Sequence, residues 1–176
     1  MAKCGIAVDA FEPDPIHFKL LKRNLTLNGI SNCTPHEAAV SDHPGQMEFV
    51  RVLGNTTGSH LAGAKKNPYG DLERFEVKVA DIKEIAAGSD FLKVDAEGHE
   101  DVILAAIPGE RWKHLDAIVE VGSQKNAHKL FSHFQSIDVN VFAQKLGWQR
   151  VSSIEQMPTS YKEGGVFISA KPQMPW

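Results

Sequence analysis

Acidic side chains follow three predicted strands of this 176-residue chain, at the points where those strands end. Glu12 closes the first strand, Asp95 and Glu97 follow a central strand, and Glu120 interrupts an apolar run. In open α/β sheets, ligands bind beyond the carboxyl ends of the strands. These carboxylates are therefore the first candidates for chemistry.

Glu12 has the setting of a ribose-binding residue. A carboxylate at a strand end can accept two hydrogen bonds from the vicinal hydroxyls of a ribose. The alternative is a solvated carboxylate in front of a helix that begins at Pro15, stabilised by the positive end of the helix dipole. The setting alone leaves both interpretations open.

Three carboxylates, Asp95, Glu97 and Glu100, lie within six positions at a strand-to-helix junction, with His99 among them. Helix capping explains one or two of them but not the third. Carboxylates that are crowded together raise one another's proton affinity, which is one way to make a base that works near neutral pH. We interpret Asp95 or Glu97 as an active-site residue on this ground, with capping as the alternative.

Metal and nucleophile chemistry find little support. Because Glu120 is a carboxylate in an otherwise apolar strand, it must point to an edge of the sheet or find a partner, which suits a ligand-facing role. A divalent cation would require Asp95, Glu97 and Glu120 to converge. Spacing does not establish that convergence across three loops, so we predict no metal site. The histidines lack HExxH spacing, Cys4 and Cys33 form no CxxC, and no GxSxG elbow supports a hydrolase.

Strand and helix patterns alternate along the chain. We expect a helix from Pro15 to a stop at Gly29, a long loop over residues 55–68, and a short helical turn through Ile82 and Ile85. The other expected helices cover residues 99–107 and 139–146, and the expected strands cover residues 5–11, 33–40, 46–52, 75–79, 90–94, 117–121, 149–154 and 166–170. This order predicts one α/β domain over residues 1–176, with a mainly parallel sheet and an antiparallel C-terminal edge.

Composition narrows the classes of partner. The net charge of −3 provides no field that would attract nucleic acid or anionic lipid, so we expect neither as a partner. Two cysteines are too few for a disulfide framework, and no apolar stretch approaches the ~20 residues that span a bilayer. We therefore expect a soluble, cytoplasmic protein without a membrane segment.

Four motifs stand in order along the chain, and together they cover nearly all of it: AFEPDP at residues 10–15, NL to NG at 24–29, AAVSD at 38–42, and FLKVDAEGHE at 91–100. Their order and spacing resemble the FkbM family of S-adenosylmethionine-dependent methyltransferases. The resemblance implies a Rossmann-like methyltransferase sheet that transfers a methyl group to a hydroxyl of a sugar or another small molecule.

The resemblance also implies roles for individual residues. Glu12 would hold the ribose hydroxyls of S-adenosylmethionine, and Ala39 and Val40 would line the adenine by backbone contacts. Asp95 with Glu97 would border the methionine end and the acceptor.

Methyl transfer to oxygen needs alignment and a deprotonated acceptor more than covalent help. The candidate base is therefore Asp95, Glu97 or His99.

The sequence departs from the family at its start. Such methyltransferases open with a strand and a Gly-rich turn of the form D-x-G-A-N-x-G, and this motif is not in the chain. We therefore expect an N-terminally truncated sheet in which the strands at residues 5–11 and 90–94 pair directly or are covered by a second copy of the chain. Self-association or low stability, and a reduced affinity for the cofactor, would follow.

Two alternatives to the methyltransferase remain. The first is a non-enzymatic remnant or binding module that keeps the sheet without the cofactor. The second, a nicotinamide enzyme, is disfavoured because the chain lacks GxGxxG. Acceptor specificity would lie in loops such as residues 55–69.

Overall fold

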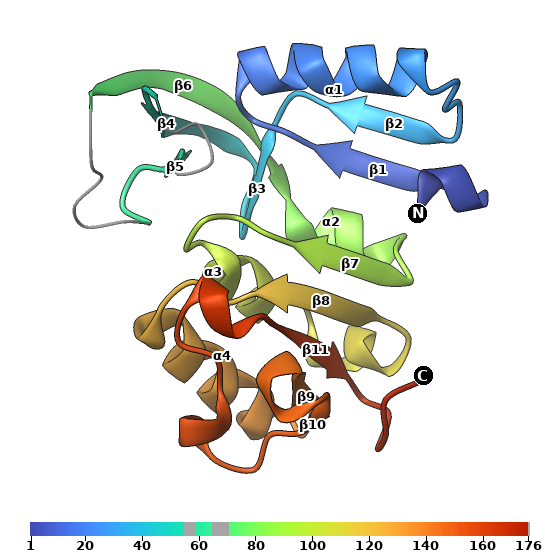
Figure 1. Ribbon diagram of the computed structural model, residues 1–176, viewed down its shortest axis with the longest axis vertical. Coiled ribbons are helices and arrows are strands. Elements are labelled where there is room, and N and C mark those ends of the chain that lie inside the picture. The colour runs from blue at the N-terminus through green and yellow to red at the C-terminus, as the bar shows by residue number, and fades with distance from the viewer. Residues whose placement is uncertain (55–58, 65–70, 176) are drawn as a thin grey trace. The chain divides into compact units, whose positions relative to one another are not determined.

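The computed structural model describes residues 1–54, 59–64 and 71–175. Its chain forms an α/β fold that divides into two compact units, Met1–Ala80 and Asp81–Trp176 (Figure 1).

The first unit begins with a strand, a helix and a parallel strand. The 3-10 turn η1 (Ala2–Cys4) precedes β1 (Val8–Phe11), which pairs in parallel with β2 (Cys33–His36). Between them, α1 (Pro15–Leu27) packs beside β2 (Figure 1). Asp14 caps this helix as the sequence predicts, because its side chain accepts hydrogen bonds from the amides of Ile16 and His17.

A second sheet completes the first unit. It contains β3 (Ala39–Ser41), β4 (Gly45–Val52), β5 (His60–Leu61) and β6 (Leu72–Asp81) in the order β3-β6-β4-β5. The long antiparallel pair β4–β6 runs from Gly45 opposite Val79 to Val52 opposite Leu72. Its inner face forms a small core of Ala39, Phe49, Leu61, Val77 and Val79.

The second unit is built on a five-stranded sheet in the order β10-β9-β11-β8-β7. Its strands are β7 (Phe91–Val94), β8 (Asp116–Glu120), β9 (Asn140–Ala143), β10 (Gln149–Arg150) and β11 (Gly165–Ser169). The α-helices are α2 (Ile82–Ala87), α3 (Glu100–Ala105) and α4 (Gln124–Ser136). Short 3-10 turns connect these elements: η3 (Gly109–Lys113), η4 (Gln144–Leu146), η5 (Ile154–Gln156) and η6 (Tyr161–Glu163).

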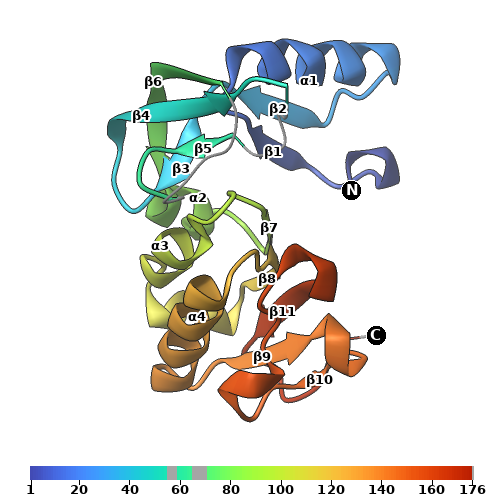
Figure 2. The same ribbon diagram turned by 60° about the vertical axis from the view of Figure 1, so that its left-hand side comes forward.

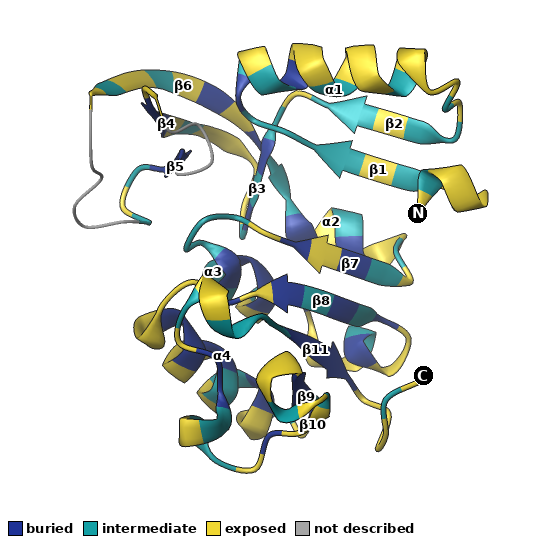
Figure 3. Ribbon diagram, viewed as in Figure 1, coloured by how far each residue is buried: buried dark blue, intermediate teal, exposed yellow. Residues whose placement is uncertain are grey.

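The core of the second unit lies between the sheet and two helices. Helices α3 and α4 pack together on one side of the sheet (Figure 2), and β11 is buried over most of its length (Figure 3). Trp112 and Phe134 meet edge to face with ring centroids 4.9 Å apart. This core fixes the carboxyl ends of β7 and β8, where the predicted acidic residues lie.

The mainly parallel sheet is not what the structure contains. The pairs β1–β2 and β7–β8 are parallel, whereas β4–β5, β4–β6, β8–β11, β9–β11 and β9–β10 are antiparallel. The predicted antiparallel C-terminal edge is confirmed by β11, β9 and β10. Of the two strands expected to pair directly, β1 belongs to the two-stranded sheet and β7 ends the five-stranded one.

Two element predictions are wrong. The helix expected over residues 139–146 is instead strand β9 followed by the turn η4. The strand expected over residues 33–40 is interrupted at residues 37–38, so that β2 and β3 belong to different sheets. Helix α4, which the sequence analysis missed, buries Ala127, Leu130 and Phe134 at helical spacing.

The long loop expected over residues 55–68 is described only in part. Residues 55–58 and 65–68 lie outside the described part of the chain, and His60–Leu61 forms β5. Among the residues that the structure describes, no helix combines the length and the apolar character needed to cross a membrane.

Candidate functional site

The predicted site residues fall into two groups, one in each unit. Glu12, Ala39 and Val40 belong to the unit Met1–Ala80, and Asp95, Glu97 and His99 belong to the unit Asp81–Trp176.

Glu12 is half-buried directly after β1. Its amide donates to the carbonyl of His36, 3.0 Å away, and its Oε1 accepts a 2.8 Å hydrogen bond from the amide of Asp14. Burial raises the pKa of the Glu12 carboxyl above its ordinary value, although the Asp14 amide and nearby His17 lower it. The other oxygen, Oε2, has no hydrogen-bond partner within the described residues, so the geometry suits a carboxylate that accepts from a ligand.

The turn that carries Glu12 is held by a buried ion pair that the sequence analysis missed. Arg51 on β4 donates from Nε to Asp14 Oδ2 at 2.6 Å and from Nη2 to Asp14 Oδ1 at 2.7 Å. Burial alone would raise the pKa of Asp14, but the hydrogen bonds from Arg51 and from the helix amides outweigh it and lower that pKa. Arg51 also donates to Glu73 and lies over the Phe75 ring, so β4 and β6 together fix the start of α1.

Ala39 and Val40 lie on the short strand β3. Ala39 is only 4% exposed and packs in the core of its sheet, whereas Val40 is half-buried. The side chain of Ala39 is therefore a packing group. The predicted backbone contacts of both residues with adenine stay a prediction.

Asp95 and Glu97 lie in the tight loop that leads from β7 to α3. Asp95 is exposed and accepts a hydrogen bond from Lys93 Nζ at 3.3 Å. Glu97 has a φ of 51°, in the left-handed region that L-residues seldom occupy, and Gly98 follows with a φ of 102°. Such strained positions cluster at binding sites when the surrounding structure holds them.

The buried side chain of Glu100 holds the backbone of this loop in place. Its carboxylate is 2% exposed and accepts from the amides of Ala96 at 2.8 Å and Gly98 at 3.1 Å, and from Asn126 Nδ2 at 2.6 Å. Burial raises the pKa of Glu100 above its ordinary value, and the negative charge of Asp95 adds to this, against the lowering by the backbone amides. The third carboxylate of the sequence motif is thus a support for the loop.

Helix capping does not account for the acidic residues before α3. The position preceding the helix is occupied by His99, whose side chain makes no capping hydrogen bond. Asp95 and Glu97 lie further upstream, in the loop. The capping alternative is therefore not supported, while the predicted catalytic roles of Asp95, Glu97 and His99 stay predictions.

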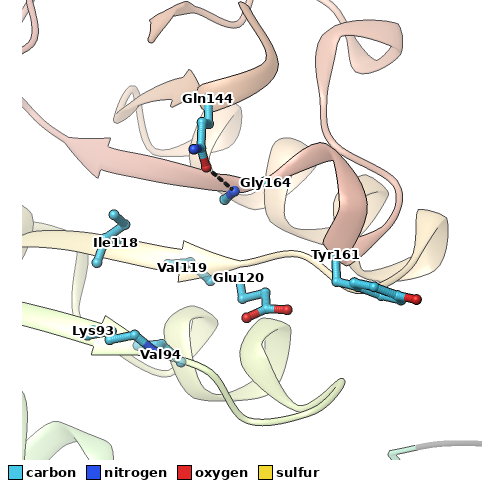
Figure 4. A pocket seen from close by; sticks show the side chains of 9 residues that line it. Lys93, Val94, Ile118, Val119, Glu120, Gln144, Tyr161 and Gly164 are labelled. Carbon is cyan, nitrogen blue, oxygen red and sulfur yellow. Dashed lines mark hydrogen bonds between the residues drawn. The ribbon is translucent and has the colours of Figure 1, made fainter. Parts of the chain in front are cut away.

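Glu120 ends β8 and lines an open pocket of about 240 Å³ (Figure 4). Burial raises the pKa of its carboxyl, and the negative charges of Asp95, Glu97 and Glu100 raise it further, whereas Lys93 lowers it. The structure thus brings the acidic residues after β7 and β8 into one electrostatic neighbourhood. No group of three or more metal-ligating side chains that could hold a metal ion occurs among the described residues.

Several residues of the pocket were not found from the sequence. Besides Glu120, it is lined by Lys93, Val94, Ile118, Val119, Gln144, Tyr161, Gly164 and Gly165. The signal that could have located them is the Gly164-Gly165 pair at the start of the last strand, because glycine in a strand often marks a close approach of backbone.

The fold and the position of its acidic groups can be compared with known proteins. Acidic groups at the carboxyl ends of parallel strands are typical of ligand-binding α/β folds. A search of solved structures finds the methyltransferase FkbM of Methylobacillus flagellatus KT with a TM-score of 0.50 and 18% identity, covering 91% of this chain and 36% of that chain. At this identity the likeness concerns the fold alone.

The family follows from the sequence itself. The family model of the methyltransferase FkbM domain matches residues 2–156, so the chain belongs to this family. Among curated proteins, Methyltransferase 1 of Beauveria bassiana (strain ARSEF 2860) is 28% identical over 134 residues, covering 62% of this chain. The chain spans 52% of the length of that relative and 36% of the solved structure.

Proposed function

We propose that this chain is part of an S-adenosylmethionine-dependent O-methyltransferase that acts on a hydroxyl of a sugar or another small molecule. The observation that carries the proposal is the acidic neighbourhood of Asp95, Glu97 and Glu120 at the ends of β7 and β8, in a chain of the FkbM methyltransferase family. A carboxylate with a raised pKa, such as that of Glu120, is suited to accept the proton of a hydroxyl.

The residue proposed for the cofactor's ribose is Glu12. Its Oε1 is engaged by the Asp14 amide, and the Arg51–Asp14 pair fixes the turn, which leaves Oε2 for a hydroxyl donor. The half-buried carboxylate thus fits a ribose. When bound, S-adenosylmethionine supplies an electrophilic methyl group on a sulfonium.

The other proposed roles follow the loop after β7. Asp95 and Glu97 border the methionine end and the acceptor, and Asp95, Glu97 or His99 accepts the acceptor's proton. Glu100 holds the backbone of this loop in place through Ala96 and Gly98. A fixed loop favours methyl transfer because alignment of the reacting atoms is the main requirement of this reaction.

A second candidate function is a binding module without cofactor. It is favoured by the absence of a D-x-G-A-N-x-G turn from the printed sequence, since this turn supplies backbone amides to the methionine part of the cofactor. For the same reason we expect the chain to bind S-adenosylmethionine more weakly than micromolar.

A thermal-shift titration with S-adenosylmethionine and S-adenosylhomocysteine tests the proposal. A ligand that binds only the folded state raises the unfolding temperature. We expect a rise at millimolar ligand, and we expect Glu12→Gln to weaken binding at least about tenfold, since hydrogen bonds to a charged group contribute about 1.5–3 kcal/mol. Glutamine keeps Oε1 for the Asp14 amide, so the turn itself stays intact.

Glu37→Gln is the matched control, because Glu37 is an exposed carboxylate of the same unit. It should bind both ligands as the wild type does. If neither ligand changes the unfolding temperature of the wild type, the methyltransferase proposal is wrong and the binding module is favoured.

A further inference from the structure

The pocket at the end of β8 combines apolar and polar lining. Figure 4 shows the side chains of Glu120 and Tyr161 beyond the end of that strand. The apolar lining comes from Val94, Ile118 and Val119. Small-molecule pockets characteristically pair an apolar surface with a few polar groups that fix orientation.

Both side-chain oxygens of Glu120 are without a hydrogen-bond partner among the described residues. Asp95 accepts from Lys93, and both oxygens of Glu100 accept from loop amides, with Asn126 donating to one of them. The Glu120 side chain makes no hydrogen bond or ion pair with any other residue in the part of the chain that the structure describes. Its carboxylate lines the pocket and is exposed.

The wall formed by Gly164 and Gly165 depends on the lack of side chains. A Cβ at Gly165 would lie 2.7 Å from the carbonyl oxygen of Val119, and a Cβ at Gly164 would collide with the Gln144 side chain. Gln144 Oε1 accepts from the Gly165 amide at 3.2 Å, which fixes the amide side chain at the pocket. The pocket is therefore bounded by backbone and by a side chain held in place.

We propose that this pocket binds the methyl acceptor as an uncharged alcohol with an apolar body, and that Glu120, in place of Asp95, Glu97 or His99, binds the reacting hydroxyl and takes its proton. This inference rests on the proposed function. As the acceptor's oxygen forms its bond to the methyl carbon, the carbon–sulfur bond of the sulfonium donor breaks, sulfur keeps that electron pair, and the hydroxyl proton passes to Glu120.

The charges around the pocket define the class of acceptor. Asp95, Glu97 and Glu100 act on Glu120 as like charges, and Lys93 is the cation that opposes them. A carboxylate or phosphate on the acceptor would meet this excess of negative charge, whereas a neutral hydroxyl would not. The site therefore discriminates against anionic acceptors.

Two matched probes test this assignment by NMR titration of the full ¹⁵N-labelled chain without cofactor. Cyclohexanol carries a hydroxyl on an apolar ring, and cyclohexanecarboxylate carries a negative charge on the same ring. We expect cyclohexanol to shift the amide signals of Val94, Glu120 and Gly165 saturably, and the carboxylate to leave them unchanged. Equal responses to the two probes, or none to cyclohexanol, would overturn the proposal.

Variants of Glu120 separate its role from the general shape of the pocket. Glu120→Ala should weaken cyclohexanol binding about tenfold, through the lost charge-assisted hydrogen bond. Glu120→Gln should admit cyclohexanecarboxylate, because it removes the repelling charge and keeps the shape. Glu110→Gln, an exposed carboxylate of η3 in the same unit, should leave both probes unaffected. If Glu120→Ala binds cyclohexanol as the wild type does, Glu120 has no binding role.

The two proposals fail separately in these measurements. Binding of S-adenosylhomocysteine without binding of cyclohexanol contradicts the pocket assignment alone. Binding of cyclohexanol without binding of either sulfur ligand contradicts methyl transfer, and with it the proton transfer to Glu120.

Discussion

At the scale of single residues, the charged Glu120 side chain at the pocket lowers the stability of the folded protein. Its pKa in the folded protein lies above the ordinary value of 4.5, because burial and the charges of Asp95 and Glu97 disfavour the carboxylate. The folded state thus holds the proton more tightly than the unfolded chain. The free energy of unfolding should fall as the pH rises through 4.5 towards the folded-state pKa, and the loss is complete above both values.

Glu120→Gln should therefore be more stable than the wild type at pH 7. We expect a gain of less than about 1 kcal/mol, since solvent screens a charge this exposed. The gain should shrink when the pH is lowered to about 4, where the carboxyl binds its proton. Urea unfolding at both pH values measures this gain in stability. A gain over the wild type that is smaller at pH 7 than at pH 4 would contradict the raised pKa of Glu120.

The positions of the acidic residues could be predicted, but their partners could not. Glu12, Asp95 and Glu120 are found because strand ends are visible in the local apolar pattern. The contact of Asp14 with Arg51 spans 37 positions, and that of Glu100 with Asn126 spans 26. No local pattern encodes such pairs, so the sequence revealed the carboxylates without showing which of them are structural.

At the scale of elements, the loop between β7 and α3 depends on helix α4. Glu100 accepts from Ala96 and Gly98 in the loop, and Asn126 of α4 donates to the same carboxylate. The Glu97 backbone, with its φ of 51°, belongs to the segment that these bonds hold. Packing of α4 against α3 thus sets the conformation of the residues proposed to border the acceptor.

Glu100→Gln should loosen this loop. The new amide group would face the Gly98 amide or Asn126 Nδ2 donor to donor, so we expect a loss of about 1–3 kcal/mol in the free energy of unfolding. Hydrogen exchange at the Ala96 and Gly98 amides should become faster, because the donor-to-donor contact displaces the side chain and a neutral oxygen replaces the charged acceptor. The exchange rates in Glu110→Gln should match the wild type. Unchanged exchange at both loop amides in Glu100→Gln would show that the carboxylate does not hold the loop.

Helices and strands were predicted correctly where the local sequence signals agree on one type of secondary structure. Helix α1 has its cap, its proline and its glycine stop, and all three agree. Residues 139–146 carry apolar residues that fit either period, and pairing with β11 makes residues 140–143 a strand. This tertiary pairing lies outside any local window, as does the switch of residues 39–41 from one sheet to another.

At the scale of the whole molecule, the outer edge of β1 is the place where the expected self-association can be tested. In its parallel pairing with β2, Val8 and Glu12 direct their amides to Asn32 and His36. Because successive residues of a strand alternate, the Asp9 amide points to the opposite edge. Among the described residues, β1 pairs only with β2, so its other edge has no strand partner within the unit Met1–Ala80.

Asp9→Pro tests this edge because it removes the outward amide and leaves the bonds from Val8 and Glu12 to β2 in place. We expect the wild type to self-associate in analytical ultracentrifugation, and Asp9→Pro to shift it towards the monomer. Asp9→Ala is the matched control: like the proline variant it loses the 2.7 Å contact with His36, but it keeps the amide. Pairing through β1 requires that the alanine variant associates as the wild type does. Equal dissociation of both variants would assign the association to the Asp9 side chain. A monomeric wild type would contradict the expected self-association itself.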